Sequence, residues 1–154
     1  MGYDRDEITQ ALDRYRAAAD HAGIDGNWRP WVECFTPDLH YIEHMYGEFH
    51  GREAVLAWIT KTMGVWPFTH MRLFPWDWCT IDAEQGWVIG QIENRFVDPG
   101  DGGIYQGANW TRLVYAGEGL FSSEEDVYNP SEFAPVVEAW LAAWAEHHPD
   151  RPNG

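Results

Sequence analysis

The chain has 154 residues, about the length of one domain, which is enough to enclose one hydrophobic core and one pocket. Ten Lys and Arg residues against 25 Asp and Glu give a formal net charge of −15, which argues against binding to nucleic acid or to an anionic membrane surface. Ten Trp, seven Tyr and seven Phe indicate an aromatic core with a dimer interface, or a pocket for a flat, apolar ligand.

The two cysteines, Cys34 and Cys79, lie far apart and form no CxxC motif. No apolar stretch follows a basic segment near the first residues, so we expect neither a signal peptide nor a membrane-spanning helix. Two reduced cysteines are typical of a cytoplasmic protein, and that is the location that we expect.

Apolar residues recur at helical spacing in three segments of the first half of the chain. The first predicted helix covers Glu7–His21 and ends at Gly23. A short second helix is predicted over Trp28–Phe35 with Asn27 as its cap, and a third over Ala54–Thr62.

Period-two alternation predicts strands before and after the third helix. A first strand over Leu39–Tyr46 turns at Gly47 into a short partner that ends near Gly51. Pro75 is expected to bend or interrupt the first of the later strands. Those later strands are predicted over Thr69–Asp82, Gly86–Val97, Ile104–Tyr115 and Gly119–Tyr128.

The chain closes with a clear helix start. Asn129 is placed to cap a helix that has Pro130 at its first position, and apolar residues then repeat at helical spacing as far as Trp144. Helices first, then antiparallel strands and one closing helix, indicate an α+β domain.

Several short segments occur in the order and spacing of a known family. They are Tyr15, Asp38–Tyr41, Gly51–Val55, Tyr115–Leu120 and Glu125–Pro130. Together they resemble the SnoaL-like branch of the nuclear transport factor 2-like superfamily, over about Glu7 to Trp144. We therefore interpret residues 1–154 as a single SnoaL-like domain.

The resemblance implies a cone-shaped α+β barrel, in which a curved, mostly antiparallel sheet is closed by the N-terminal helices and the first strand lies beside the last. It also implies a homodimer through the outer face of the sheet, where Trp76, Trp78, Trp87 and Trp110 are expected. Known members include ketosteroid isomerase, scytalone dehydratase, limonene epoxide hydrolase, polyketide cyclases and pure binding domains, so the fold does not fix the function.

In the first predicted strand, Glu43 falls in a row of mostly apolar residues. Burial disfavours the charged form of a carboxylate, which suits such a group to general acid or base catalysis. The resemblance places Glu43 where ketosteroid isomerase carries its catalytic carboxylate; the alternative is a surface Glu paired with a base. His44 faces the other way in a regular strand, and only a bulge would bring it to the pocket.

Two amides lie in apolar rows of later strands. Asn94 shares a face with Phe96, and Asn109 shares a face with Thr111. A buried amide needs hydrogen-bond partners, which are either a substrate oxygen or the backbone. The resemblance places Thr111 where the isomerase has a second acid, and this departure argues against steroid isomerisation.

Glu124, Asp126 and Tyr128 share one face of the last predicted strand. If the first strand lies beside the last, Asp126 or Glu124 lies near Glu43, and two carboxyls that share a site separate into one acid and one base. A solvated acidic edge explains the same pattern equally well.

Metal binding and cofactor binding have no local signal. The histidines form no ligand pair on a helix, and His40 and His44, on one strand face, would be about 13 Å apart. Only residues that converge across strands would make a metal site. We expect no metal, and the absence of a glycine-rich phosphate loop leads us to expect no cofactor.

Three functions remain open. The favoured one is a cofactor-independent isomerase, dehydratase, cyclase or epoxide hydrolase acting on a hydrophobic, oxygenated small molecule. The others are a binding protein without catalysis and a structural dimeric domain. For the enzyme, Glu43 would be the base, His44 or Asp126 its partner, and Asn109 and Tyr15 the donors; the expected lining is Trp28, Trp58, Asn94, Phe96, Thr111 and Tyr128.

Overall fold

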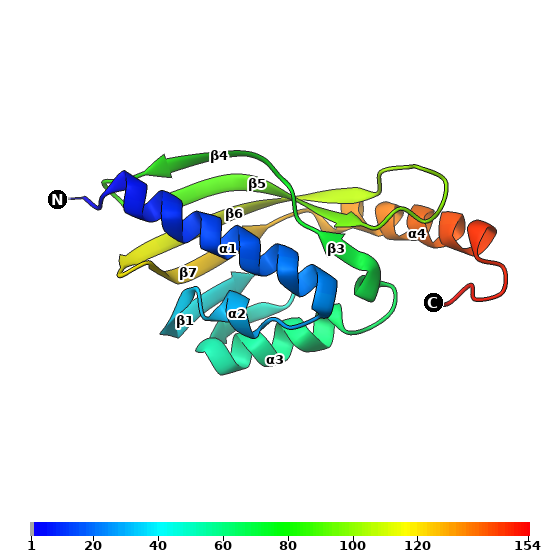
Figure 1. Ribbon diagram of the computed structural model, residues 1–154, viewed down its shortest axis with the longest axis horizontal. Coiled ribbons are helices and arrows are strands. Elements are labelled where there is room, and N and C mark those ends of the chain that lie inside the picture. Colours follow the sequence, from blue (N-terminus) through cyan, green and yellow to red (C-terminus); the bar gives the residue numbers. More distant parts are fainter. Residues whose placement is uncertain (1) are drawn as a thin grey trace.

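The computed structural model describes residues 2–154, and Figure 1 shows how their helices and strands are arranged. The helices are α1 (Arg5–Asp25), α2 (Arg29–Val32), α3 (Arg52–Met63), a 3-10 turn η1 (Phe68–His70) and α4 (Pro130–His147). The strands are β1 (Phe35–Glu43), β2 (Gly47–His50), β3 (Met71–Leu73), β4 (Trp76–Asp82), β5 (Trp87–Phe96), β6 (Gln106–Gly117) and β7 (Leu120–Val127).

The strands form one seven-stranded sheet in the order β2-β1-β7-β6-β5-β3, and β4 pairs with β5 beside β3. Only β1 and β7 run parallel, and every other pairing is antiparallel. The sheet is curved and does not close on itself. The predicted α+β class is confirmed, as is the expectation that the first strand lies beside the last.

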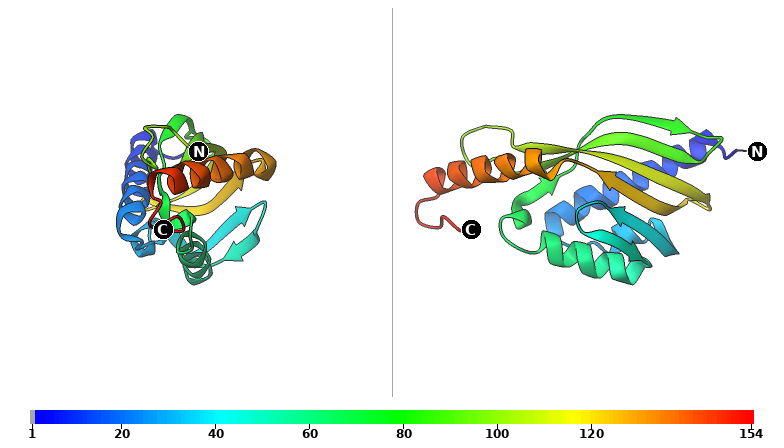
Figure 2. Two further views of the ribbon diagram at one scale, coloured as in Figure 1. Left: turned by 90° about the vertical axis from the view of Figure 1, so that its right-hand side faces the viewer. Right: turned by 180° about the vertical axis from the view of Figure 1, so that it is seen from behind.

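Helices cover one face of this sheet. In Figure 1, α1 crosses diagonally in front of the strands, and α2 and α3 lie beside β1. Figure 2 shows that α4 continues from the end of β7 beyond the sheet, at the end opposite to the N-terminus. The N-terminal helices therefore cover the inner face, as predicted, and α4 adds a further wall.

Of the two predicted ends of the long helices, the cap of α4 is confirmed and the end of α1 was wrong. Asn129 accepts a hydrogen bond from the Ser131 N–H at 3.1 Å at the start of α4. The first helix, however, passes through Gly23 and ends at Gly26, whose φ is 72°. Gly23 is needed for packing instead, because a Cβ there would lie 2.2 Å from the carbonyl oxygen of Arg72.

The predicted boundary between the second helix and the first strand was wrong. Helix α2 ends at Val32 and β1 begins at Phe35, where the backbone pairs with Phe121 of β7. Tertiary pairing with the last strand therefore overrides the helical spacing of the aromatic residues. The interruption expected at Pro75 is confirmed, since β3 ends at Leu73 and β4 begins at Trp76.

Strand β4 contains an irregularity that alternation does not predict. Trp76 pairs with Ile92 but Trp78 pairs with Gln91, so the register shifts at Asp77. Trp76 consequently packs on the inner core, whereas Trp78 is exposed on the outer face. The expectation that Trp76 lies on the dimerising face was therefore wrong.

The core has two parts. The main one lies between the sheet and helices α1 to α3, and the smaller one lies under α4. No helix within residues 2–154 is long and apolar enough to cross a membrane.

Candidate active site

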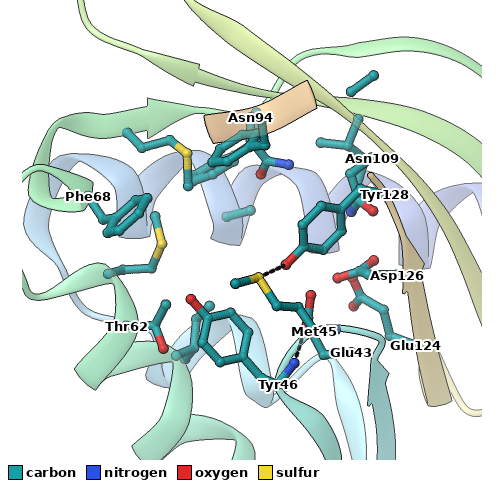
Figure 3. A pocket seen from close by; sticks show the side chains of 18 of the residues that line it. Glu43, Met45, Tyr46, Thr62, Phe68, Asn94, Asn109, Glu124, Asp126 and Tyr128 are labelled. Carbon is teal, nitrogen blue, oxygen red and sulfur yellow. Dashed lines mark hydrogen bonds between the residues drawn. The ribbon is translucent and has the colours of Figure 1, made fainter. Parts of the chain in front are cut away.

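A cavity of about 440 Å³ lies between the inner face of the sheet and the helices. Its wall is mostly aromatic and apolar, with side chains from α1, α2, α3 and α4 and from six of the strands. The polar residues of the wall are concentrated on β1, β6 and β7 (Figure 3). They include Tyr41, Glu43, Asn94, Asn109, Glu124, Asp126 and Tyr128.

Parallel pairing between β1 and β7 gathers three carboxyl groups in this wall. Tyr41 is the partner of Glu124, and Glu43 is the partner of Asp126. Because side chains alternate along each strand, all four point to the inner face. Glu43, Glu124 and Asp126 are 4%, 2% and 8% exposed, and Figure 3 shows their carboxyl groups close together.

Two tyrosine hydroxyls hold the carboxyl groups of Glu124 and Asp126. Tyr15, from α1, donates to Glu124 Oε1 at 2.8 Å, and Tyr41 lies 3.3 Å from the same oxygen. The Tyr41 hydroxyl also donates to Asp126 Oδ2, so it bridges the two acids. Both tyrosines are almost fully buried, which fixes the geometry of the pair.

A second chain of hydrogen bonds reaches Asp126 from β6. Thr111 Oγ1 donates to Asp126 Oδ1 at 2.6 Å, and Asn109 Nδ2 donates to Thr111 Oγ1 at 3.1 Å. Since the threonine proton is directed to Asp126, the amide of Asn109 must present its N–H to Thr111. Asn109 therefore acts as an orienting group here, and its Nδ2 is already engaged as a donor.

Burial shifts the ionisation of this pair. Desolvation, followed by the negative charge of Asp126, raises the pKa of Glu124 well above its usual value. Desolvation also raises the pKa of Asp126, although hydrogen bonds from Thr111, Tyr41 and Asn109 lower it in part. Two carboxyls with raised pKa values in one site favour a state that retains a proton near neutral pH.

Glu43 is held in a different way, by the turn that follows β1. The backbone N–H groups of Met45 and Tyr46 donate to Glu43 Oε2, at 2.8 and 2.5 Å. Its other oxygen, Oε1, receives neither of these N–H groups. The Tyr128 hydroxyl lies nearby, 3.5 Å from the Met45 sulfur, and burial together with Glu43 raises the pKa of Tyr128.

Several predicted lining residues do reach the cavity. Trp28 and Trp58 form part of its aromatic wall, and Asn94 and Tyr128 lie among its polar groups. Glu43, Asp126, Asn109 and Tyr15 are also in the wall. The structure thus brings together most of the side chains that alternation placed on inner faces.

His44, Phe96 and Thr111 lie elsewhere. No bulge turns His44 inward; its Nε2 lies 2.9 Å from Glu125 Oε2 on the outer face, so the placement of His44 at the pocket was wrong. Phe96 faces inward but beyond the cavity, where its ring stacks on Trp140 of α4 at 4.8 Å. Thr111 is buried behind Asp126 and acts on the site through that residue.

Glu124 and Tyr41 are the site residues that sequence reasoning did not select. Glu124 was considered only as an alternative neighbour of Glu43, and Tyr41 was given no role in the site. The residue-by-residue pairing of β1 with β7 was the missing information. With that register, Tyr41 and Glu43 on β1 would lie directly beside Glu124 and Asp126 on β7. This arrangement would have identified the two neighbouring acids as a pair.

Among residues 2–154, one group of side chains has metal-ligand chemistry, and it lies outside the cavity. The ligand atoms of His40, Glu48 and His50 all lie within 4.8 Å of one another on the outer face of the β1–β2 hairpin. These residues converge across strands, the one arrangement that local spacing does not reveal. None of them contributes to the cavity wall.

Comparisons with known proteins identify the family. The model of the SnoaL-like domain family matches residues 3–119. No curated protein sequence matches the chain.

Solved structures with the same fold differ widely from the chain in sequence. An LEH-like epoxide hydrolase of M. tuberculosis is 11% identical, with a TM-score of 0.68 and 95% of each chain covered. The BvnE pinacolase of Penicillium brevicompactum is 13% identical, with a TM-score of 0.64, covering 90% of this chain and 93% of the other. An NTF2-like protein of Anabaena variabilis is 12% identical, with a TM-score of 0.62, covering 84% and 94%. At these identities the likeness shows the fold alone.

Proposed function

This chain belongs to the SnoaL-like domain family, and we propose that it is a cofactor-independent enzyme that performs general acid–base chemistry on an apolar, oxygenated small molecule. The observation that carries the proposal is the buried pair of carboxyls, Glu124 and Asp126, beside a third carboxylate, Glu43, in the wall of an apolar cavity. Structural carboxyls are rarely buried in this way without a cation, whereas catalytic ones often are.

Each carboxyl has a distinct part in the proposed chemistry. Glu43 is the base, because it lies in the cavity wall and the turn engages only its Oε2. It would take a proton from a substrate C–H group or from water. The Glu124–Asp126 pair, which retains one proton in this proposal, is the acid and would protonate the oxygen on which negative charge develops.

The tyrosines and Thr111 are positioning residues. Tyr15 and Tyr41 hold Glu124, and Thr111 holds Asp126, so the acid enters the reaction already oriented. This arrangement suits isomerisation, dehydration, cyclisation or epoxide opening, all of which move a proton to or from carbon or oxygen. Relatives with this fold include an epoxide hydrolase and a pinacolase, which supports the class of reaction but does not specify it.

The charge of the wall also restricts the ligand. Glu43, Glu124, Asp126 and Glu138 line the cavity, and Arg16 is the one Lys or Arg among the described lining residues. The guanidinium of Arg16 makes a cation–π contact within the wall, 4.6 Å from the centre of the Trp76 ring. A neutral ligand therefore fits better than an anionic one, which acidic groups would repel.

Probe reactions test the proposal before the natural substrate is known. Opening of styrene oxide, isomerisation of cyclohex-3-enone and dehydration of a β-hydroxy ketone each need an acid and a base in an apolar site. We expect turnover of at least one probe by the intact chain and a loss of about 100-fold in Asp126→Asn. Glu125→Gln, which changes the neighbouring outer carboxyl, is the matched control and should retain the rate.

Turnover that survives Asp126→Asn would remove the carboxyl pair from the mechanism. If no probe reacts, but styrene oxide or cyclohex-3-enone still binds in calorimetry, the alternative of a binding protein without catalysis gains support.

A further inference from the structure

The outer face of the β1–β2 hairpin carries a group of side chains that the proposed function does not use. His40 on β1 is the direct antiparallel partner of His50 on β2, and Glu48 lies two residues before His50. Side chains two apart on a strand point to the same face, so all three project outward from the sheet. Their placement follows from the register of the hairpin alone.

The three side chains already lie close together. His40 Nε2 and Glu48 Oε2 are 2.8 Å apart, and the rings of His40 and His50 are parallel with 4.6 Å between their centres. One ligand atom from each of His40, Glu48 and His50 lies within 4.8 Å of the other two. Ligands of a tetrahedral zinc ion at ~2.0–2.1 Å are about 3.4 Å apart, so the side chains are near the required spacing, and the stacked imidazole rings would rotate to direct their nitrogen atoms at one ion.

We propose that His40, Glu48 and His50 form a binding site for a divalent transition metal ion of the zinc class, with water in the fourth position. Two imidazoles and one carboxylate are ligands that zinc, and similarly cobalt, accept, whereas calcium and magnesium need more oxygen atoms. The side chains of His40 and Glu48 are 38% and 57% exposed, so an ion has access from solvent. The net charge of −15 favours the approach of a cation.

The position of the site gives it a structural consequence. Strand β2 is at the edge of the sheet, and a metal ion would tie it to β1 through side chains as well as backbone. On the opposite face of β2, the ring of Phe49 stacks on Trp58, which lines the cavity, at 4.8 Å. The turn of this hairpin also supplies the N–H groups that hold Glu43. A bound ion would thus stabilise one wall of the cavity without entering it.

Zinc titration of the intact chain tests the site, after treatment with chelator and dialysis. Calorimetry should give one zinc ion per chain, and zinc should raise Tm because it binds the folded state. His50→Ala should weaken zinc binding by about tenfold or more, since it removes one of three ligands. His44→Ala is the matched control, because His44 lies on the same outer face but pairs with Glu125.

Cobalt(II) provides an independent readout, since tetrahedral coordination gives intense visible absorption. We expect this absorption in the wild-type chain and in His44→Ala, and not in His50→Ala. Equal zinc affinity in the wild-type chain and His50→Ala would overturn the proposal, as would the absence of any zinc-dependent change in heat or Tm. Because catalytic turnover is not measured, the outcome is independent of the proposed enzymatic function.

Discussion

Glu124 and Glu125 are neighbours on β7, yet the sheet places them in opposite environments. Glu124 points inward, is 2% exposed, and accepts hydrogen bonds from two tyrosines without a cation. Glu125 points outward, where Arg112 lies 3.0 Å away and His44 2.9 Å away. The carboxyl of Glu125 is therefore balanced by the charge of Arg112, whereas burial raises the pKa of Glu124 and so favours its protonated form.

The difference shows that the two faces of the sheet treat carboxyl groups differently. The outer face follows the usual pattern, in which each charge is paired with an opposite charge or with water, and such pairs contribute little to stability. The inner face keeps carboxyls in a setting that opposes their ionisation, at a cost in stability. Groups held in this way are characteristic of functional sites.

The largest expected effect is on catalysis. Glu43→Gln keeps shape and hydrogen-bonding capacity but removes the titrating group, so we expect turnover to fall by about 10²–10⁴-fold. Stability should hold or rise, because a neutral amide avoids the burial of a charge. Steady-state rates and Tm should be measured on the same preparation. Full activity in Glu43→Gln would contradict the assignment of the base, and Glu125→Gln should match the wild-type chain.

The chain is expected to form a homodimer through the outer face of the sheet. Trp78 and Trp110 are 39% and 57% exposed there, with their rings 5.5 Å apart in an edge-to-face arrangement. Trp110→Glu would bury an unpaired charge in such an interface and should raise the dimer dissociation constant by about 100-fold. Sedimentation at micromolar concentration measures this directly. A wild-type chain that sediments as a 17.8 kDa monomer would contradict the prediction.

The dependence of stability on pH should distinguish the two neighbouring carboxyls. A raised pKa in the folded state means that stability is greatest below the usual Glu value of 4.5 and is lost as the pH rises through the folded pKa of Glu124. Glu124→Gln removes this loss. It should therefore raise Tm at pH 8, by about 3 °C for each ~1 kcal/mol gained in the free energy of unfolding. It should have little effect on Tm at pH 4.

Glu125→Gln is the contrasting variant in the same experiment. It removes an ion pair with Arg112 and a hydrogen bond with His44, and it should lower the free energy of unfolding at pH 8 by about 0.5 kcal/mol. Equal thermal curves for Glu124→Gln and Glu125→Gln across this pH range would mean that the two faces do not differ as described.

The smallest effect is expected from metal removal. Catalysis by carboxyl groups needs no metal, and the cluster of His40, Glu48 and His50 does not line the cavity. Exhaustive chelation should therefore leave kcat unchanged, even if Tm falls. Activity that disappears with chelator and returns with zinc would place a metal in the reaction instead.

Local patterns in the sequence predicted the order of elements well. Alternation along β1 placed Glu43 on the inner face correctly, because the pairing of that strand with β7 is regular from His40 to Glu43. Alternation failed at Trp76, because the register shift at Asp77 reverses the faces of the residues before it. Gly90 leaves room for the inward-facing Trp76, because a Cβ at Gly90 would lie 2.7 Å from the Trp76 ring.

The composition of the site was less predictable because it depends on pairing between distant strands. Alternation placed Glu124 beside Asp126, but a polar row of this kind is equally compatible with a solvated edge. Glu124 is enclosed by Tyr15, which is 109 residues away and donates to it, and by Tyr41, its partner in the parallel pairing of β1 and β7. The same limit explains why Phe96 was wrongly expected in the cavity wall. Its side chain does face inward, but it packs on Trp140 of the closing helix, which strand alternation does not predict.

We predict that the Glu124–Asp126 pair retains a proton at neutral pH, because burial raises the pKa of both carboxyls. Infrared difference spectroscopy of the intact chain tests it, because a protonated carboxyl has a C=O band that a carboxylate lacks. We predict this band at pH 7 in the wild-type chain and in Glu125→Gln, and its loss in the double variant Glu124→Gln, Asp126→Asn. A wild-type spectrum without a protonated carboxyl at pH 7, or a band that survives in the double variant, would contradict the account.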